Sequence, residues 1–456
     1  MTEKQMRSFT VVGAGRSGVG ISKLLASKGN SVLLYDENSE AALKYLDKPG
    51  LKETGVDLCL GRWDEKVLNC EVLVKSPGVP PGSEIILKAK TLGIKIISEI
   101  EAAYWYCPCP IIAVTGTNGK TTTTVLTGAI FRNAGIDAKV CGNVGLAFSE
   151  IIDELNRDSI VILEVSSYQL NDIDSFKPAV GVIMNITPDH LEWHGGFDNY
   201  LSAKFRIAEN MDTESTMIVN YDDTVLKDSA ETLKATKAYF GLTEDTYKNC
   251  EQGAYGNDRK MYYFNKSLNI HEEIMETHDI NIRGKHNFYN SLAAAISART
   301  FGIKNEVISS TLKTFPGVEH RIEFTREFNG VKFFNDSKAT NVESMAVALE
   351  AFDGNLVLIM GGREKGNNYS AVDALVKEKV KAIIALGESR KKISEHFGSF
   401  IKTIEAETME GAVAKALTAS VPGDSILLSP ACKSFDMFES FEHRGEVFKK
   451  IVNALK

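Results

Sequence analysis

The segment Gly116-Thr117-Asn118-Gly119-Lys120-Thr121-Thr122 has the composition of a loop that binds phosphate groups. It follows an apolar run at 111–114, which predicts a buried strand, and it precedes a helical pattern. In such a unit, backbone N–H groups and a lysine ammonium surround phosphates, while a hydroxyl group can bind Mg²⁺. The spacing departs from the usual phosphate-binding loop, because Val114 stands where that loop has its first glycine. We expect a nucleotide site at this segment.

Polar residues also follow two later apolar runs. One run ends in Glu164, where the metal-binding acid of a nucleotide site usually lies, although a helix-capping role is the alternative. The run 180–186 predicts a strand that leads to Asp189 and His190. For His190, a hydrogen-bonded turn residue and a functional residue are equally compatible with the sequence. Lys204, taken alone, resembles an ordinary helix lysine.

A second glycine motif lies near the N-terminus. Gly13-x-Gly15-x-x-Gly18 separates a predicted strand from a helical pattern, and Asp36 ends the next predicted strand. This spacing is typical of a dinucleotide fold, in which the backbone approaches a diphosphate and an acid accepts a ribose hydroxyl bond. Both NAD(P) and another diphosphate, such as that of a UDP-sugar, fit the pattern. The turn Ser76-Pro77-Gly78 closes this site or is an ordinary turn.

Three polar clusters follow predicted strands in the last third of the chain, at 335–341, 361–366 and 429–436. Ligands of α/β sheets bind at the C-terminal ends of the strands. Each cluster alone could be a helix cap with a solvated charge. Together the three favour a composite binding surface.

The elements that must position these residues predict an α/β fold. The chain has 456 residues, which suggests about three domains. Strand, turn and helix patterns recur three times, with a proline-containing linker at 107–110. We expect a Rossmann-like domain at 1–108, a central P-loop ATPase domain at 109–317 and a Rossmann-like domain at 318–456. The segment 215–282 is expected to be rich in strands and turns, and no chemistry is assigned to it.

The composition excludes several classes of protein. Lys and Arg number 52 against 60 Asp and Glu, and the net charge of −8 argues against a general nucleic-acid-binding surface. No apolar run approaches the roughly 18 residues of a membrane helix. Seven scattered cysteines fit reduced thiols better than a disulfide framework. We expect a cytoplasmic monomer that binds neither nucleic acid nor membrane.

The motifs together resemble the Mur ligases, the ATP-dependent amino-acid-adding enzymes of peptidoglycan synthesis. The resemblance rests on the loop at 116–122, Glu164 in Glu-Val-Ser-Ser-Tyr-Gln-Leu, Asp189-His190, Ala203-Lys204, Gly284-Lys-His-Asn-Phe-Tyr-Asn290 and His320-Arg321. Segments 335–341, 429–436 and 441–445 are similar to those of the members that add D-glutamate. The resemblance covers nearly the whole chain, and its weakest part is the segment 215–282.

The resemblance implies a ligase that joins D-glutamate to UDP-N-acetylmuramoyl-L-alanine through an acyl phosphate, with ATP converted to ADP and phosphate. It also implies that the N-terminal domain holds UDP and not NAD(P). Another amino-acid-adding ligase of the family, or an enzyme like folylpolyglutamate synthetase, is the alternative. An NAD-dependent oxidoreductase would leave Lys120, Glu164 and the third domain unexplained.

The resemblance further implies roles for individual residues. ATP would be bound by Gly116, Thr117, Asn118, Gly119, Lys120, Thr121, Thr122, Asn287, Asn290, Arg321 and Asp336. The UDP substrate would be bound by Gly13, Gly15, Arg16, Ser17, Gly18, Asp36, Ser76, Pro77, Gly78 and Asn143. D-glutamate would be bound by Lys338, Thr340, Lys365, Ser434, Phe435 and Phe441.

Four residues carry the implied chemistry, namely Lys120, Glu164, His190 and Lys204. Thr121, Glu164, His190 and Lys204 would hold two Mg²⁺ ions, with Mn²⁺ as an alternative ion. Lys204 matches a lysine that the family carries as a carbamate made with CO2, which turns a cation into an anion that can bind metal. His190 or a nearby carboxylate is the candidate base for the D-glutamate amine.

Overall fold

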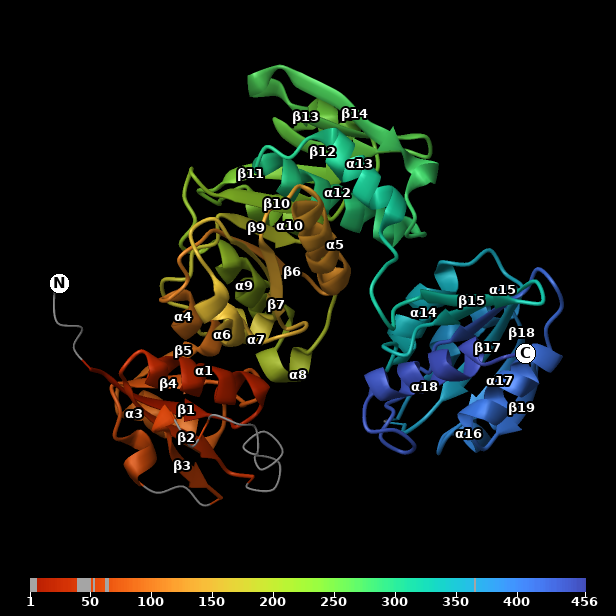
Figure 1. Cartoon of the computed structure of the whole chain (residues 1–456), viewed down its shortest axis with the longest axis horizontal. Helices are drawn as coiled ribbons and strands as arrows, with labels where there is room; N and C mark the ends of the chain where they lie inside the picture. Colours follow the sequence, from red (N-terminus) through yellow and green to blue (C-terminus); the bar gives the residue numbers. More distant parts are fainter. Residues whose placement is uncertain (1–5, 39–50, 52–53, 62–64, 365) are drawn as a thin grey trace. The chain divides into compact units, whose positions relative to one another are not determined.

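The structure is a computed structural model that describes residues 6–38, 51, 54–61, 65–364 and 366–456. The described part contains three sheets, each with helices against it (Figure 1). Strands buried on both faces are nearly continuously apolar, as parallel sheets covered by helices require. The predicted α/β fold is therefore confirmed.

The first sheet has the strand order β3-β2-β1-β4-β5, and all of its strands are parallel. Its strands are β1 (Ser8–Val12), β2 (Ser31–Asp36), β3 (Asp57–Leu60), β4 (Val72–Lys75) and β5 (Lys95–Ser98). Its helices are α1 (Arg16–Ser27), η2 (Glu65–Leu68), α3 (Glu84–Thr91) and α4 (Glu99–Tyr104). This order is that of a Rossmann-like half, as predicted.

The second sheet has nine strands in the order β14-β13-β12-β11-β10-β9-β6-β8-β7. Its strands are β6 (Ile111–Thr115), β7 (Ala138–Gly142), β8 (Ile160–Glu164), β9 (Val180–Ile183), β10 (Thr216–Asn220), β11 (Thr236–Gly241), β12 (Gln252–Gly256), β13 (Lys260–Asn265) and β14 (Ile270–Glu276). Strands β6 to β12 pair in parallel, and β13 pairs antiparallel with both β12 and β14. The predicted β-rich segment 215–282 thus extends the sheet that carries the nucleotide loop.

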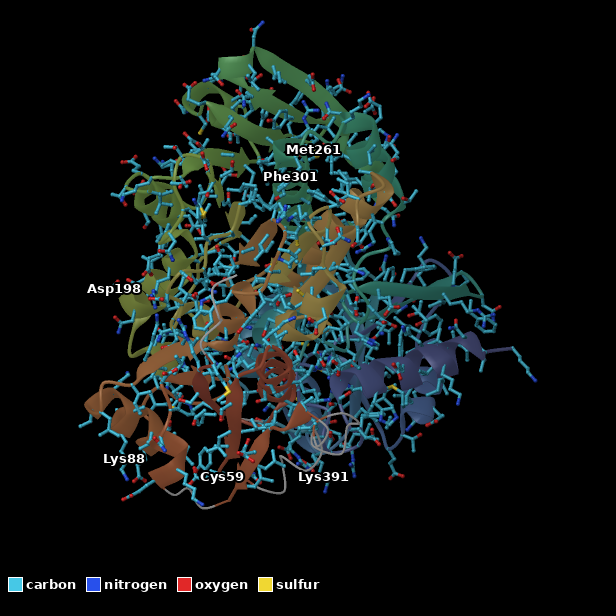
Figure 2. The ribbon with its side chains drawn as sticks, turned by 60° about the vertical axis from the view of Figure 1, so that its left-hand side comes forward. Cys59, Lys88, Asp198, Met261, Phe301 and Lys391 are labelled. Atoms are coloured by element: carbon cyan, nitrogen blue, oxygen red, sulfur yellow. The ribbon has the colours of Figure 1, made fainter. Side chains whose placement is uncertain are left out.

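The helices of this part connect the strands and cover the sheet (Figure 1). They are α5 (Lys120–Asn133), α6 (Phe148–Ile151), η3 (Ile152–Glu154), α7 (Ser167–Leu170), α8 (Leu191–His194), α9 (Phe197–Phe205), η4 (Arg206–Ala208), α10 (Thr224–Ala230), α11 (Asp245–Asn249), η5 (Lys266–Leu268), η6 (Thr277–Asp279), α12 (Lys285–Thr300) and α13 (Asn305–Thr314). Figure 2 shows Met261 of β13 and Phe301 after α12 among the side chains of this part.

Strand β9 ends at Ile183 and is therefore shorter than the strand that the apolar run 180–186 predicts. The backbone N–H of Ile186 donates to the Asp223 carboxylate at 3.0 Å and so leaves the strand ladder. The side chain of Asn185 bonds to Asn118 in the nucleotide loop. The end of the predicted strand is therefore a loop that belongs to the site.

The third sheet has the order β15-β16-β20-β17-β18-β19, and only its edge strand β15 is antiparallel to its neighbour. Its strands are β15 (Glu323–Phe328), β16 (Val331–Asn335), β17 (Leu356–Gly361), β18 (Val380–Leu386), β19 (Lys402–Ala406) and β20 (Ser425–Leu428). Its helices are α14 (Val342–Glu350), η7 (Tyr369–Val372), α15 (Asp373–Lys379), α16 (Arg390–Phe397), α17 (Met409–Thr418) and α18 (Phe441–Asn453). Separate apolar cores form on the two faces of this sheet.

The chain divides into two compact units. One comprises Met1–Ile280 with Tyr289–Lys313 and holds the first two sheets, whose apolar residues form a joint core. The other comprises Asn281–Phe288 with Thr314–Lys456 and holds the third sheet. The predicted boundaries at 108 and 317 remain predictions. Within the described residues, no helix is both long and apolar enough to span a membrane.

Candidate active site

The central candidate site lies at the carboxyl edge of the second sheet. Strand β6 lies between β8 and β9, and all three run in parallel. Val114 is in register with Glu164, and Thr115 is in register with Ile183. The loops that follow these strands therefore meet at one edge, which brings the glycine loop, Glu164 and the segment 184–190 together.

The glycine loop is held in a preformed shape. Gly119 has φ +83°, and a Cβ atom placed on it would lie 2.5 Å from Oδ1 of Asn290. The Asn118 N–H donates to Oδ1 of Asn185 at 2.8 Å, and Nδ2 of Asn185 donates back to the Asn118 carbonyl at 3.0 Å. Asn185 was not among the predicted site residues, although a polar residue at the end of a buried apolar run was a usable signal.

The Lys120 ammonium folds back over this loop. Its Nζ donates to the carbonyls of Gly116 at 2.9 Å and Thr117 at 2.8 Å. An anionic phosphate oxygen is a stronger acceptor than a neutral carbonyl. Lys120 is therefore placed to bind an anion at the start of α5, where the helix dipole adds to the attraction.

Asn290 lies beneath the loop and not on its open side. It is buried, and its Oδ1 accepts a hydrogen bond from the Thr123 hydroxyl at 3.2 Å. Thr121 and Thr122 are buried in the first turn of α5. This geometry favours a supporting role for Asn290 over the predicted contact with adenine or ribose.

Lys204 is not an ordinary surface lysine. Its side chain is 2% exposed, and its Nζ donates to the Gly116 carbonyl at 2.8 Å. The Tyr200 ring lies 4.8 Å from the Nζ atom. Burial, together with the charge of Lys120, lowers the Lys204 pKa well below its ordinary value. The site therefore favours a neutral amine, which is a nucleophile.

Glu164 offers an unused acceptor in the same place. It is 2% exposed, and its Oε1 accepts a hydrogen bond from Nδ2 of Asn143 at 2.9 Å. Its Oε2 is buried without a hydrogen-bond partner among the described residues. A buried carboxylate oxygen of this kind fits a bound cation.

The protein side chains alone do not complete a metal site. The described part of the chain has no group of three or more His, Cys, Asp or Glu arranged to hold a metal ion. An ion at Glu164 would need further oxygen ligands from a hydroxyl, a carbamate, water or phosphate, which are ligands that Mg²⁺ accepts.

His190 is exposed and directly precedes α8 as its N-cap residue. It adopts a left-handed conformation with φ +52°, and its side chain is half-exposed. Its Nε2 lies 3.4 Å from Oδ2 of Asp189, and its ring centroid lies 5.1 Å from that of Tyr168. The imidazole can therefore reach a bound substrate.

The first sheet carries a separate cavity of about 880 Å³ at its carboxyl edge. It is lined by most of the residues predicted to bind the UDP substrate, namely Gly13, Gly15, Ser17, Asp36, Ser76, Pro77 and Gly78. The Ser76 hydroxyl donates to the Gly13 carbonyl at 2.9 Å, and a Cβ atom on Gly18 would overlap that same carbonyl oxygen. Gly18 thus serves close packing beneath the cavity.

Two residues of the predicted UDP site have hydrogen-bond partners within the protein. The Asp36 carboxylate accepts hydrogen bonds from the N–H groups of Ala14 at 2.6 Å and Asn38 at 2.8 Å, so it already supports the glycine loop. The Arg16 guanidinium donates to the Gly145 carbonyl, and Arg16 lines a different cavity of about 410 Å³. The pattern could not distinguish these contacts from direct ligand binding.

The loops that follow three strands of the third sheet also meet at one edge of that sheet. Strands β16, β20 and β17 are neighbours and run in parallel, so the polar clusters that follow them converge. The Ser429 hydroxyl donates to Oδ2 of Asp336 at 2.7 Å. Burial raises the pKa of Asp336 to about 7, although Ser429 and the charge of Arg321 oppose the shift.

Arg444 of α18 ties two of these loops together. It is buried, and its guanidinium donates to the Ser337 hydroxyl at 2.9 Å, the Ser337 carbonyl at 2.8 Å and the Cys432 carbonyl at 3.0 Å. Arg444 was not among the predicted site residues. Its place in the segment 441–445, which carries the family resemblance, was the available signal.

The described residues among those predicted to bind D-glutamate lie on these loops and on α18. The Lys338 ammonium lies 5.7 Å from the centre of the Phe441 ring. Ser434 is buried, whereas Phe435 is 57% exposed. Thr340 lies just before α14. Lys365 lies outside the described residues.

The remaining predicted nucleotide contacts, Asn287 and Arg321, also belong to this second unit. The Nε atom of Arg321 is buried without a hydrogen-bond partner among the described residues, so it can donate to a ligand. Burial and the charge of Arg321 lower the pKa of His286 to about 4. Asn287 donates to the Arg283 carbonyl at 2.8 Å.

Three family models match consecutive parts of the chain. They are the Mur ligase MurD-like N-terminal domain at 7–98, the Mur ligase middle domain at 114–298 and the Mur ligase glutamate ligase domain at 320–432. Each match covers one of the three sheets, in whole or in large part.

Named relatives match over the full length. A UDP-N-acetylmuramoylalanine–D-glutamate ligase of Salinibacter ruber is 42% identical over 466 residues, which cover 100% of both chains. A protein of the same name from Caldicellulosiruptor bescii is 40% identical, with 98% of each chain covered. The fold is similar to that of MurF ligase from Thermotoga maritima in complex with ADP, with a TM-score of 0.58, 15% identity and 99% of each chain covered. The chain therefore belongs to the Mur ligase family.

Proposed function

We propose that this chain joins D-glutamate to UDP-N-acetylmuramoyl-L-alanine, with ATP as the energy source, in peptidoglycan precursor synthesis. Membership of the Mur ligase family and 42% identity to a ligase named for these substrates support the proposal. The observation that carries it is the buried Lys204 amine, which shares the Gly116 carbonyl with Lys120 of the nucleotide loop.

The proposed reaction has two steps. The alanine carboxylate attacks the γ-phosphorus of ATP, which forms an acyl phosphate and releases ADP. The D-glutamate amine then attacks the acyl carbon, and phosphate leaves as the amide forms. Lys120 offsets the charge of the phosphates during the first step, when two anions approach each other.

We propose that Lys204 reacts with CO2 before catalysis. Its neutral amine attacks the carbon of CO2, a C–N bond forms, and the nitrogen loses a proton to give an N-carboxylate anion. The low pKa and burial of Lys204 supply the required neutral amine. Mg²⁺, or Mn²⁺ in its place, would supply charge neutralisation at the phosphates, with Thr121, Glu164, His190 and the carbamate as its protein ligands.

Two groups are proposed as the base for the D-glutamate amine: a nearby carboxylate, or His190 when its imidazole is not bound to the metal. The exposed His190 imidazole can accept the proton that the amine must lose before it attacks. The nearby Asp189 orients the imidazole through a contact of 3.4 Å.

The substrates are assigned to three places. The cavity of the first sheet is proposed to hold UDP, with Asp36 as a support of its glycine loop and Asn143 beside Glu164. ATP is assigned to the loop at 116–122, and in the second unit Asn287, Arg321 and Asp336 are proposed nucleotide contacts. The loops around Lys338 in the second unit are proposed to bind D-glutamate, whose two carboxylates need cationic partners.

We also propose three domains at 1–108, 109–317 and 318–456, and a monomer in the cytoplasm. ATP and nucleotide-activated sugars are cytoplasmic metabolites, which supports that location. Light scattering of the purified chain tests the monomer.

One assay tests the proposed function. Phosphate release from ATP is measured with UDP-N-acetylmuramoyl-L-alanine present, and D-glutamate, L-glutamate or L-lysine is then added in turn. We expect release with D-glutamate alone and none when the nucleotide-sugar substrate is omitted. Release that is indifferent to D-glutamate would contradict the proposal, and release with a folate and L-glutamate would favour a folylpolyglutamate synthetase-like activity.

A further inference from the structure

Two cysteines lie close together on the loop that joins α4 to β6. The Sγ atoms of Cys107 and Cys109 are 3.8 Å apart, and the Cys107 Sγ lies 3.4 Å from the Cys109 carbonyl oxygen. Both side chains are half-buried and pack against the core of the first unit. Pro108 between them and Pro110 after them restrict the backbone, so the folded chain keeps the two thiols in contact.

The contact makes the two thiols chemically unequal. The contact between the two sulfur atoms lowers the pKa of Cys107 and raises the pKa of Cys109. A thiolate, and not a thiol, is the nucleophile in thiol–disulfide exchange. Cys107 is therefore suited to attack first, and Cys109 is suited to follow.

We infer that Cys107 and Cys109 form a reversible dithiol–disulfide site that reacts with low-molecular-weight disulfides. The Cys107 thiolate attacks one sulfur of the small disulfide, which forms a mixed disulfide and releases one small thiolate. Cys109 then loses its proton and attacks the Cys107 sulfur, which forms the intrachain S–S bond and releases the second small thiolate. The protein loses two electrons and two protons, and the small disulfide is reduced to two thiols.

The bridge is expected to be easily reduced. A disulfide across a single intervening residue closes a small ring, and strained bridges have more oxidising potentials than structural ones. Such a bond follows the thiol–disulfide balance around it and is not a permanent cross-link. It would modify the loop that leads directly into β6, the strand that carries the nucleotide loop.

Mass spectrometry of the full-length chain tests the inference. The protein is equilibrated in mixtures of oxidised and reduced glutathione, the remaining thiols are blocked with iodoacetamide, and the peptide that contains residues 107–109 is weighed. We expect this peptide to lose two hydrogen atoms, to carry no glutathione and to be restored by dithiothreitol. The Cys109→Ser variant is expected to hold glutathione on Cys107 instead.

Two other cysteines provide controls. Cys59 is half-buried on β3 of the first sheet (Figure 2), and Cys59→Ser should leave the bridge unchanged. Cys141 is buried, which raises its pKa, so it should stay unmodified. If the native wild-type chain carries glutathione at Cys107 or Cys109 without the intrachain bond, or if both thiols stay free at every ratio, the inference is wrong.

Discussion

At the scale of single residues, Lys204 shows how burial changes the chemistry of a common side chain. An exposed lysine is protonated at neutral pH and would repel a metal ion. Lys204 is 2% exposed beside a second lysine, so its charged form is disfavoured. The same residue is thereby prepared for a reaction with CO2 that a surface lysine would carry out poorly.

Replacement of Lys204 tests this chemistry. We expect Lys204→Ala to lower the ligase rate about a hundredfold or more, because it removes the carbamate that would help to hold Mg²⁺, whose charge would stabilise the transferred phosphoryl group. Short carboxylic acids should restore part of the rate, whereas bicarbonate should not, since no amine remains to be carbamylated. Lys95→Ala, at an exposed ion pair with Asp174, is the control and should keep full activity. Full activity in Lys204→Ala would refute the carbamate.

The contact between Gly119 and Asn290 can be tested with a matched pair of glycines. Gly119 and Gly135 have nearly the same backbone, with φ +83° and +80°, but an added Cβ meets Asn290 only at Gly119. Either alanine should cost about 1–2 kcal/mol of stability through the left-handed conformation. Only Gly119→Ala should also raise the KM for ATP, by at least about tenfold. Equal KM values in the two variants would show that the contact does not shape the loop.

At the scale of elements, a buried charged network joins β4, α4 and the segment after α7. The Lys75 ammonium lies 2.5 Å from the Asp172 carboxylate, and the Gln169 amide donates to Glu99 at 2.7 Å. Lys75 directly precedes the turn that lines the cavity of the first sheet, and α7 begins three residues after Glu164. The network therefore connects β4, which leads into the proposed substrate cavity, with α7, which follows the proposed metal ligand Glu164.

Glu99 makes this network sensitive to pH. Burial raises its pKa from 4.5 to about 7, although Gln169 and Lys75 oppose the shift. Between pH 4.5 and 7 the unfolded chain has lost this proton while the folded chain keeps it, so stability falls as pH rises through that window. The full effect is at most about 3 kcal/mol. Scanning calorimetry should show Glu99→Gln gaining stability relative to the wild type between pH 5 and 8, and a constant difference would contradict this account.

Beside the third sheet, Arg444 of α18 likewise connects separate elements through buried polar contacts. Arg444→Ala leaves buried carbonyls of Ser337 and Cys432 without donors, which should cost about 2 kcal/mol or more. The loop that carries Lys338 should then loosen, so the KM for D-glutamate should rise more than the KM for the nucleotide-sugar substrate. Arg444→Lys should recover part of the effect, and Arg390→Ala, at a half-exposed ion pair, should change neither KM. An equal rise in both KM values would indicate general destabilisation only.

At the scale of the whole molecule, the proposed sites are distributed over two compact units. The first holds the nucleotide loop and the cavity of the first sheet, and the second holds the loops around Asp336 and Lys338. The chain carries a net charge of −8, yet its proposed sites concentrate Lys120, Arg321 and Lys338 because all three substrates are anionic. Net charge therefore describes the surface of this protein and not its sites.

Ligand binding should stabilise the two units unequally. UDP-N-acetylmuramoyl-L-alanine at about one hundred times its Kd should raise the free energy of unfolding of the part of the chain that binds it by about 2.7 kcal/mol. Hydrogen exchange should show this protection in the first unit, around Gly13 and Ser76, and weaker changes in the second. Gly13→Val should abolish it, since a side chain there would meet Ser76 in a backbone with φ +98°. Protection confined to the second unit would contradict the assignment of the cavity.

Local patterns predicted most of the scaffold. The glycine loop, Glu164 and inner strands of all three sheets were predictable because each depends on a few neighbouring residues: a run of apolar side chains, then a turn, then a helix. The edge strands β3, β5, β7, β15 and β19 were not predicted. The exact end of β9 was not predictable, because Asn185 and Ile186 bond to Asn118 and Asp223, residues distant in the sequence. The spacing of Asp36 and Arg16 predicts ligand contacts, which remain predictions, but it could not predict their hydrogen bonds to Ala14 and Gly145.

The sequence by itself determined the α/β fold, the phosphate-binding loop and the membership of the family, because these follow from short-range periodicity and from residues at constant spacing. Only the tertiary structure decided that Lys204 is buried and disposed to be neutral, and that Cys107 and Cys109 touch. It also decided that Oε2 of Glu164 has no hydrogen-bond partner in the described part of the chain. The physical reason is that burial, pKa and hydrogen-bond partners depend on chain segments that meet only after folding.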